Sequence, residues 1–234
     1  FEHDADYVPY VDGKPRYDGV AAFLASRGIE LPHGDPSDPP DRETVCGVGN
    51  AKNDRFREIV QSGDIPVFEG TMTIVDQLRE RGVRCGVASS SRNCRLVLEQ
   101  TGLMSRFETV VDGTDSRELG LNGKPAPDIF VTACERLNVD PEASMMVEDA
   151  YSGVEAGRNG SFGLVLGVAR NGDPDGLRER GADMVVSDLS EITLDDITAR
   201  FGAPQAARPA GDGAEERRTR RGRAQAAMTA PGGE

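Results

Sequence analysis

Five short apolar segments, each separated from the next by a helical segment, constrain the fold of this 234-residue chain more than any other feature. The apolar segments span residues 84–88, 107–111, 144–147, 162–168 and 182–186. Apolar residues at helical spacing mark the helical segments 71–82, 94–102, 128–137, 153–159 and 175–180. Strands that alternate with short helices are typical of βαβ units, in which parallel strands carry helices on both faces of the sheet.

This pattern occupies residues 67–201 and predicts an α/β, Rossmann-like parallel sheet. Residues 1–66 instead predict a small helical domain, with an irregular start over 1–17 and a helix over 18–28. Residues 43–61 also have helical spacing, but Gly47 and Gly49 interrupt it, so we expect two helices there. Residues 202–234 hold almost no large apolar residue, and we expect a disordered tail whose arginines have no function.

Composition excludes several classes of protein. A net charge of -13 argues against nucleic-acid binding, and no apolar run approaches the roughly 20 residues of a membrane span. The four cysteines show no CxxC spacing and are expected to be buried thiols in a reducing compartment. Only two histidines are present, which argues against a histidine zinc site or a Ser-His triad. We expect a monomeric cytoplasmic enzyme.

The chemistry is concentrated between residues 123 and 153. Lys124 lies at the start of a predicted helix, and the Glu148-Asp149 pair ends a short apolar strand. An ammonium can neutralise a phosphoryl oxygen, while carboxylates are ligands suited to Mg²⁺. In an open α/β sheet, ligands bind at the carboxyl ends of the strands. Each residue taken singly is more simply a solvated surface group, but the linked pattern predicts a phosphate and Mg²⁺ site.

A serine-rich loop, residues 89–93, follows another predicted strand and opens a helix. Backbone N–H groups at a helix N-terminus, together with the Ser89 hydroxyl, can bind a phosphate. Alone this signal is weak, because serines cap helices routinely.

Together, the three segments resemble the motifs of the haloacid dehalogenase (HAD) superfamily. Ser89 matches its second motif, Lys124 its third, and Glu148 with Asp149 its fourth. The resemblance implies a HAD core with a small helical cap domain, and a Mg²⁺-dependent phosphotransferase or phosphatase. It also implies catalytic roles for Ser89 and Lys124, and metal binding by Glu148 and Asp149.

The helical opening block resembles the cap of the β-phosphoglucomutase-like branch. The resemblance implies that Arg16 binds the distal phosphate of a small phosphorylated sugar, and that Lys52 and Asn53 contact the sugar phosphate. A surface arginine after a proline is the equally weighted alternative for Arg16. The loop residues implied to bind substrate or phosphate are Ser90, Ser91, Arg92 and Asn93.

One departure from the superfamily is serious. HAD enzymes carry an apolar strand ending in Asp-x-Asp-Gly, whose first Asp is the nucleophile and whose second is the general acid/base. Asp4 and Asp6 follow no strand, Asp112 lacks a partner two places before it, and Asp173 with Asp175 is expected in a loop away from its strand. We therefore expect the first strand and its helix to lie upstream of Phe1, and the chain as given not to catalyse phosphoryl transfer.

Two alternatives stay open. A plain HAD phosphatase on a small phosphate ester would release phosphate without 1-to-6 isomerisation of a sugar phosphate. A non-catalytic remnant would bind phosphate or a partner. An in-frame strand with Asp-x-Asp-Gly upstream would favour an enzyme, and its absence would favour the remnant.

Overall fold

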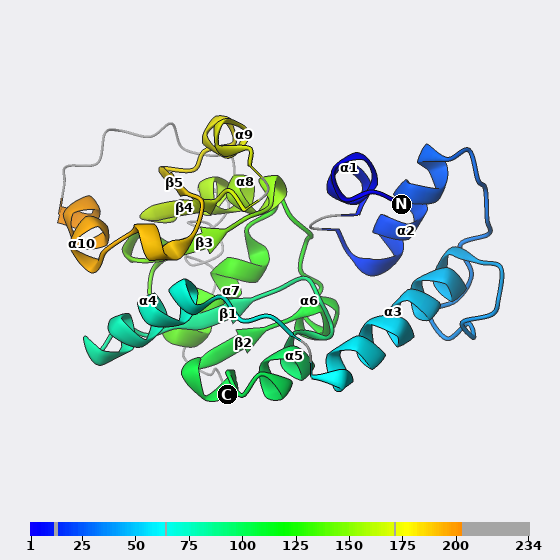
Figure 1. The fold of residues 1–234 in the computed structure, drawn as a ribbon, viewed down its shortest axis with the longest axis horizontal. Coiled ribbons are helices and arrows are strands. Elements are labelled where there is room, and N and C mark those ends of the chain that lie inside the picture. The colour runs from blue at the N-terminus through cyan, green and yellow to red at the C-terminus, as the bar shows by residue number, and fades with distance from the viewer. Residues whose placement is uncertain (12–13, 64, 171, 203–234) are drawn as a thin grey trace, which may run out of the picture.

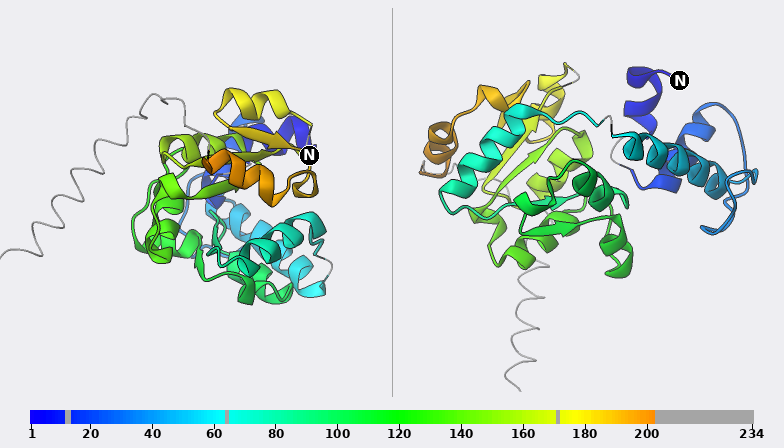
Figure 2. Two further views of the ribbon diagram at one scale, coloured as in Figure 1. Left: turned by 90° about the vertical axis from the view of Figure 1, so that its left-hand side faces the viewer. Right: turned by 60° about the horizontal axis from the view of Figure 1, so that its bottom comes forward.

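The computed structural model describes residues 1–11, 14–63, 65–170 and 172–202. A helical part comes first in the chain, and an α/β part follows it (Figure 1). Figure 1 and the right-hand view of Figure 2 place the helical part beside the α/β part.

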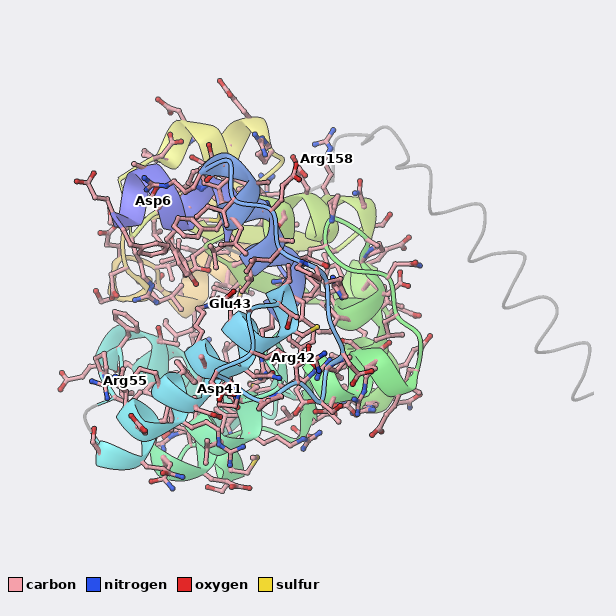
Figure 3. All side chains as sticks on the ribbon, turned by 90° about the vertical axis from the view of Figure 1, so that its right-hand side faces the viewer. Asp6, Asp41, Arg42, Glu43, Arg55 and Arg158 are labelled. Carbon is pink, nitrogen blue, oxygen red and sulfur yellow. The ribbon has the colours of Figure 1, made fainter. Side chains whose placement is uncertain are left out.

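Three α-helices form most of the helical part: α1 (Val8–Tyr10), α2 (Arg16–Ser26) and α3 (Val45–Ser62). A π-helical turn, His3–Tyr7, precedes α1, so the expectation of an irregular start was wrong for these residues. Backbone bonds that the sequence pattern does not announce, such as Asp6 N–H to the Glu2 carbonyl (3.0 Å), order this stretch. Charged side chains, among them Asp41, Arg42 and Arg55, cover the outer face (Figure 3).

Helix α3 is one continuous helix, and the prediction of two helices was wrong. Thr44 caps it by accepting the Gly47 N–H at 2.9 Å. Both glycines are required by packing: a Cβ at Gly47 would overlap the Arg42 carbonyl oxygen, and a Cβ at Gly49 would lie 2.8 Å from the Tyr17 ring. The glycines therefore permit close approach and do not end the helix.

Within the described residues, the α/β part contains five strands, as the sequence predicts. The strands are β1 (Gly86–Ala88), β2 (Thr109–Val111), β3 (Met145–Glu148), β4 (Leu164–Val168) and β5 (Met184–Val186). The helices among them are α4 (Glu69–Glu80), α5 (Cys94–Gln100), α6 (Gly113–Glu118), α7 (Asp128–Leu137), α8 (Tyr151–Asn159), α9 (Pro174–Glu179) and α10 (Leu194–Gly202). Short 3₁₀ turns lie at Met104–Arg106, Pro141–Ala143 and Leu189–Glu191.

The helices cover both faces of the strands. In β4, Leu164, Leu166 and Val168 belong to a buried cluster with side chains of α4 and α10, while Val165 faces a second cluster with side chains of α7 and α8. This alternation follows from the two-residue period of a strand, and β4 is buried along its whole length. The structure confirms the predicted α/β architecture.

The strands form two parallel sheets instead of one. β1 pairs with β2, and β3, β4 and β5 pair in that order. Figure 1 shows β1 as the strand nearest to β3 across the break. Val111 of β2 and Met146 of β3 nevertheless belong to the same buried cluster. The two sheets thus share one core, yet no ladder joins β1 to β3 within the residues that the structure describes.

Of the four cysteines, Cys46, Cys94 and Cys134 are buried and Cys85 is partly exposed, so the expectation of buried thiols was wrong for Cys85. All four are free thiols. Among the described helices, none is long and apolar enough to cross a membrane. The predicted tail lies outside the described residues beyond Gly202.

Candidate active site

The residues that the sequence singles out lie around one cavity of about 860 Å³. The helical part lines one side, and the carboxyl ends of β1 and β3 line the other. The lining includes Arg16, Lys52, Asn53, Ser89, Ser90, Ser91, Arg92, Asn93, Lys124, Glu148 and Asp149. These residues come from both parts of the molecule and from five separate stretches of sequence.

Lys124 and Glu148 form an ion pair at the floor of the cavity. The Lys124 Nζ lies 2.5 Å from Glu148 Oε1, and the side chains are only 7% and 13% exposed. The ammonium also lies 4.9 Å from the centre of the Phe130 ring. A Cβ at Gly153 would overlap the Glu148 carboxylate, so the absence of a side chain there makes room for the pair. The floor thus holds a cation and a carboxylate in fixed positions.

Glu148 and the exposed Asp149 form the carboxylate pair at the end of β3. The described residues contain no group of three or more His, Cys, Asp or Glu side chains arranged to hold a metal ion. Mg²⁺ keeps several waters and commonly takes one or two carboxylates together with phosphate oxygens. Two carboxylates beside the Lys124 ammonium therefore fit Mg²⁺ when water and another oxygen ligand complete its coordination.

The serine loop folds differently from the expectation that its N–H groups are open to a phosphate. The Ser91 N–H donates to Ser89 Oγ at 3.2 Å, and the Asn93 N–H donates to Ser91 Oγ at 3.1 Å. The Ser89 N–H in turn donates to the Val111 carbonyl at 2.9 Å, which ties the loop to β2. Two backbone donors are thus already engaged within the loop.

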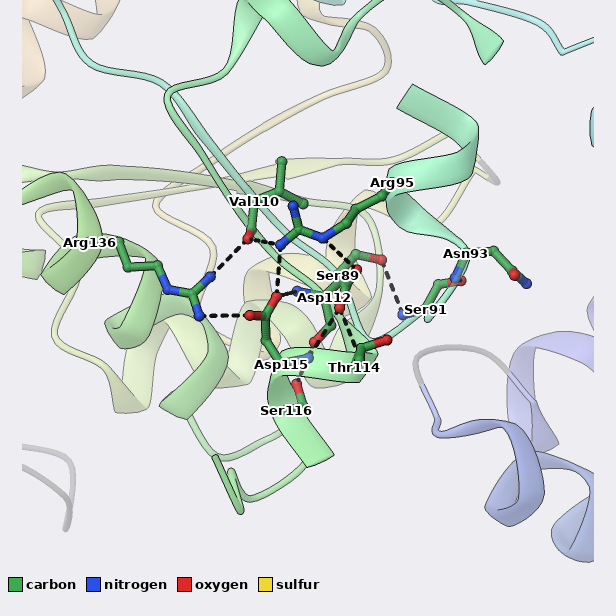
Figure 4. A network of polar contacts seen from close by, with 10 residues as sticks. All are labelled: Ser89, Ser91, Asn93, Arg95, Val110, Asp112, Thr114, Asp115, Ser116 and Arg136. Atoms are coloured by element: carbon green, nitrogen blue, oxygen red, sulfur yellow. Dashed lines mark hydrogen bonds and ion pairs between the residues drawn. The ribbon is translucent and has the colours of Figure 1, made fainter. Parts of the chain in front are cut away.

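Sequence reasoning missed a partly buried ionic network behind this loop (Figure 4). Asp112 and Asp115 cap the start of α6 reciprocally. Arg95 of α5 contacts both carboxylates at 3.1 Å, and Arg136 of α7 contacts Asp115 at 2.7 Å. Both arginines also donate to the Val110 carbonyl, at 2.8 and 3.0 Å. The Asp-x-x-Asp spacing could have predicted the helix cap, but not its arginine partners.

The network supports the loop through Gly113. The Gly113 N–H donates to the Ser91 carbonyl at 3.2 Å, and a Cβ at Gly113 would overlap the Ser90 carbonyl oxygen. The start of α6 is thus held against the serine loop, and Ser116 and Arg117 of α6 also line the cavity.

Arg16 projects into the cavity from the start of α2. Its guanidinium donates to Asn50 Oδ1 at 3.3 Å and to Asn53 Oδ1 at 2.5 Å. Asn93 of the α/β part donates to the same Asn53 oxygen at 2.8 Å. The Lys52 side chain remains accessible through the cavity, but partial removal of its ammonium from water, followed by the charge of Arg16, lowers its pKa.

Tyr17 is a further cavity residue that sequence reasoning missed. The guanidinium carbons of Arg16 and Arg92 each lie 5.9 Å from the centre of its ring. The Tyr17 hydroxyl donates to Asn50 Oδ1 at 3.0 Å, which fixes the ring. The sequence shows a tyrosine directly after Arg16, but the position of its ring between Arg16 and Arg92 depends on how the helical part packs against the α/β part.

The aspartates that the sequence analysis rejected as the nucleophile are not among the described residues that line the cavity. Asp6 pairs with Arg27 at 2.5 Å, and Asp112 belongs to the partly buried network. Asp173 caps α9 and accepts the Tyr151 hydroxyl, while Asp175 lies in the first turn of α9. Asp173 thus lies outside a helix or strand, as expected, whereas the expectation of a loop was wrong for Asp175, because Pro174 starts a helix.

Comparison with known proteins places this geometry in a family. The model of the haloacid dehalogenase-like hydrolases matches residues 11–160, and the chain belongs to this family. A β-phosphoglucomutase of Mycobacterium bovis is 47% identical over 195 residues, which are 82% of this chain and 74% of the relative.

Two further comparisons bear on function and fold. A trehalose-phosphate phosphatase of Mycobacterium leprae is 38% identical over 135 residues, 56% of this chain and 29% of the relative. The crystal structure of a β-phosphoglucomutase from Clostridium difficile has a TM-score of 0.68 at 20% identity, covering 82% of this chain and 79% of that one. The last comparison shows a shared fold.

Proposed function

We propose that the protein is a Mg²⁺-dependent phosphotransferase that acts on a small phosphorylated sugar, with a mechanism like that of β-phosphoglucomutase. One observation carries the proposal: a single cavity combines the Lys124–Glu148 pair and Asp149 on its floor with Arg16 and Asn53 on the opposite side. Two cationic positions on opposite sides of a cavity suit a substrate with two anionic ends. The 47% identity to a β-phosphoglucomutase supports this reading.

The floor residues would act on the phosphoryl group that is transferred. Lys124 neutralises a phosphoryl oxygen, and the Ser89 hydroxyl donates to another, so that the charge that develops during transfer is stabilised. Glu148 and Asp149 would hold Mg²⁺, which when bound supplies charge neutralisation at the phosphoryl oxygens. The nearly buried setting of the Lys124 side chain strengthens its interaction with a phosphoryl oxygen, because water screens it less.

The helical part would act as a cap over the sugar. Residues 1–66 form this cap in the proposal, and the α/β core spans 67–201. Arg16 binds the distal phosphate, Lys52 and Asn53 lie beside the sugar, and residues 90–93 complete the site from the core. Cap closure excludes water and favours transfer to a sugar hydroxyl over hydrolysis.

The nucleophile would come from a strand between β1 and β3. These two strands end at the cavity floor, share one core, and carry no ladder to each other within the described residues. A parallel strand in that place would end beside Asp149, and an Asp-x-Asp-Gly sequence there would supply the nucleophile, the acid/base and a further Mg²⁺ ligand. We propose that this strand is not among the described residues, so that the described chain by itself lacks the attacking carboxylate.

A plain phosphatase on a small phosphate ester is the second candidate, and the similarity to a trehalose-phosphate phosphatase favours it. It would use the same floor residues, and water would hydrolyse the aspartyl phosphate to release inorganic phosphate and regenerate the carboxylate.

The test adds the proposed nucleophile strand to the chain. Residues 1–234 are compared with the same chain extended at its N-terminus by an apolar strand that ends in Asp-x-Asp-Gly. The assays measure phosphate release from sugar phosphates, and conversion of a sugar 1-phosphate to the 6-phosphate, with and without Mg²⁺. We expect both turnover and a cooperative thermal melt in the extended chain alone.

Each negative result has a separate meaning. Robust Mg²⁺-dependent turnover by residues 1–234 would contradict the proposed strand. No turnover of any sugar phosphate by a cooperatively folded extended chain would contradict the proposed enzyme. Phosphate release without isomerisation would favour the phosphatase.

A further inference from the structure

One oxygen atom links the two sides of the cavity. Asn53 Oδ1 accepts a hydrogen bond from Arg16 Nη2 at 2.5 Å and another from Asn93 Nδ2 at 2.8 Å. Arg16 and Asn53 belong to the helical part, while Asn93 lies in the core loop before α5. Two N–H donors from different parts of the molecule therefore converge on one neutral amide oxygen.

Arg16 is held in this direction by its other arm. Its Nη1 donates to Asn50 Oδ1, which also accepts the Tyr17 hydroxyl. The Asn50 amide nitrogen donates to the carbonyls of Pro36 and Asp38, at 3.1 and 2.8 Å. Because hydrogen bonds fix both the oxygen and the nitrogen of the Asn50 amide, the Arg16 guanidinium keeps its orientation whether or not Asn53 accepts a hydrogen bond from it.

The charges around Asn53 favour an anion over a neutral group. Lys14, Arg16 and Lys52 line the cavity from the helical part, and Asp18 is the carboxylate among the described lining residues of that part. Three cations thus face one acid, and a neutral amide oxygen is the acceptor between the two converging donors.

We propose that Asn53 Oδ1 occupies the position that an anionic oxygen of the substrate takes when it binds, and that the substrate must displace it. The proposal rests on the proposed function, in which Arg16 binds a phosphate. Arg16 already carries a positive charge, and a phosphate adds a negative charge and bidentate geometry on the acceptor side, so a phosphate oxygen outcompetes the neutral amide while a neutral sugar hydroxyl does not. Asn53 thereby selects for an anionic substrate end. Once the Asn53 side chain is displaced, the bound ligand takes its place between Arg16 of the cap and Asn93 of the core.

The test measures inorganic phosphate binding to the strand-extended protein by calorimetry, in a Lys124→Ala background that removes the floor cation. Asn53→Ala removes the competing acceptor and leaves both donors in place. We expect its dissociation constant for phosphate to fall about tenfold, the equivalent of one charge-assisted hydrogen bond. Asn53→Ser, whose side chain is too short to reach both donors, is expected to act in the same direction.

Three controls complete the set. Arg16→Ala and Asn93→Ala each remove a donor and should weaken binding. Gln61→Ala removes an exposed amide from the same helix, away from the cavity, and should leave the dissociation constant unchanged. Circular dichroism checks that every variant keeps its helical content.

The outcomes separate this inference from the function on which it rests. Weaker or unchanged phosphate binding in both Asn53 variants, with weaker binding in Arg16→Ala, would overturn the displacement and leave the anion site standing. Phosphate binding that is unaffected by Arg16→Ala, or absent altogether, would overturn both the anion site and the displacement.

Discussion

Replacing Asp115 with asparagine tests the partly buried network behind the serine loop. Asp115 is 16% exposed and contacts Arg95 and Arg136, and it also accepts the Asp112 N–H at 2.9 Å. Burial by itself raises the pKa of Asp115. Hydrogen bonds from Arg136, the Asp112 backbone and Arg95 outweigh this effect and lower the pKa from 3.8 to about 2.

The size of the effect follows from this pKa. Each unit of pKa corresponds to about 1.4 kcal/mol of interaction that favours the charged form. The lowering of the Asp115 pKa therefore corresponds to about 2 kcal/mol of folding free energy at neutral pH. Asp115→Asn should lower the free energy of unfolding by about this amount, because the amide keeps the shape and loses the charge.

The pH dependence has a definite sign. Since folding lowers the pKa of Asp115, its contribution is fully present above about pH 4 and is lost as the pH falls toward 2. Urea melts of the strand-extended protein, taken from pH 7 down to pH 3, should show a loss in the wild type that is smaller in Asp115→Asn.

Asp175→Asn is the matched control. Asp175 pairs with Arg178 within one helix, and its side chain is 85% exposed, so its loss should change stability by at most about 0.5 kcal/mol. If the Asp115 and Asp175 variants lose equal stability at pH 7, the network does not stabilise the fold as its geometry implies.

Three further predictions concern the cavity in the strand-extended protein. Asp149→Asn should raise the Mg²⁺ concentration needed for half-maximal turnover about tenfold, and an unchanged Mg²⁺ titration would exclude Asp149 as a ligand. Arg16→Ala should lower kcat/KM for isomerisation by about 10- to 100-fold and affect hydrolysis of a simple monophosphate ester less. Equal losses on both substrates would remove Arg16 from the distal phosphate site. Gly153→Ala should destabilise the fold by about 1–3 kcal/mol and displace Glu148, and an unchanged urea melt and Mg²⁺ titration would show that the pair tolerates a side chain there.

The sequence by itself determined the α/β architecture and the composition of the cavity floor. Strand and helix periods are local properties, so five strands could be placed to within a few residues, and helix 128–137 was placed with its observed bounds. Lys124 and Glu148 lie 24 positions apart, yet their meeting could be anticipated. Parallel strands bring their carboxyl ends to one edge of a sheet. Glu148 is the last residue of β3, and Lys124 lies in the loop before α7, so both were expected at that edge.

Only the tertiary structure decided how the two parts of the molecule meet. Asn53 and Asn93 are 40 positions apart and belong to no common period, so nothing in the sequence announced their hydrogen bond. The same holds for Asp115, whose partners Arg95 and Arg136 come from helices on opposite sides of it in the chain. Gly47 and Gly49 show the reverse case: glycine disfavours a helix interior, and the prediction of two helices was wrong because close packing against Arg42 and Tyr17 requires both glycines inside one helix. Local periodicity reports which face of an element is buried, whereas packing across elements decides which polar groups on those faces come within bonding distance.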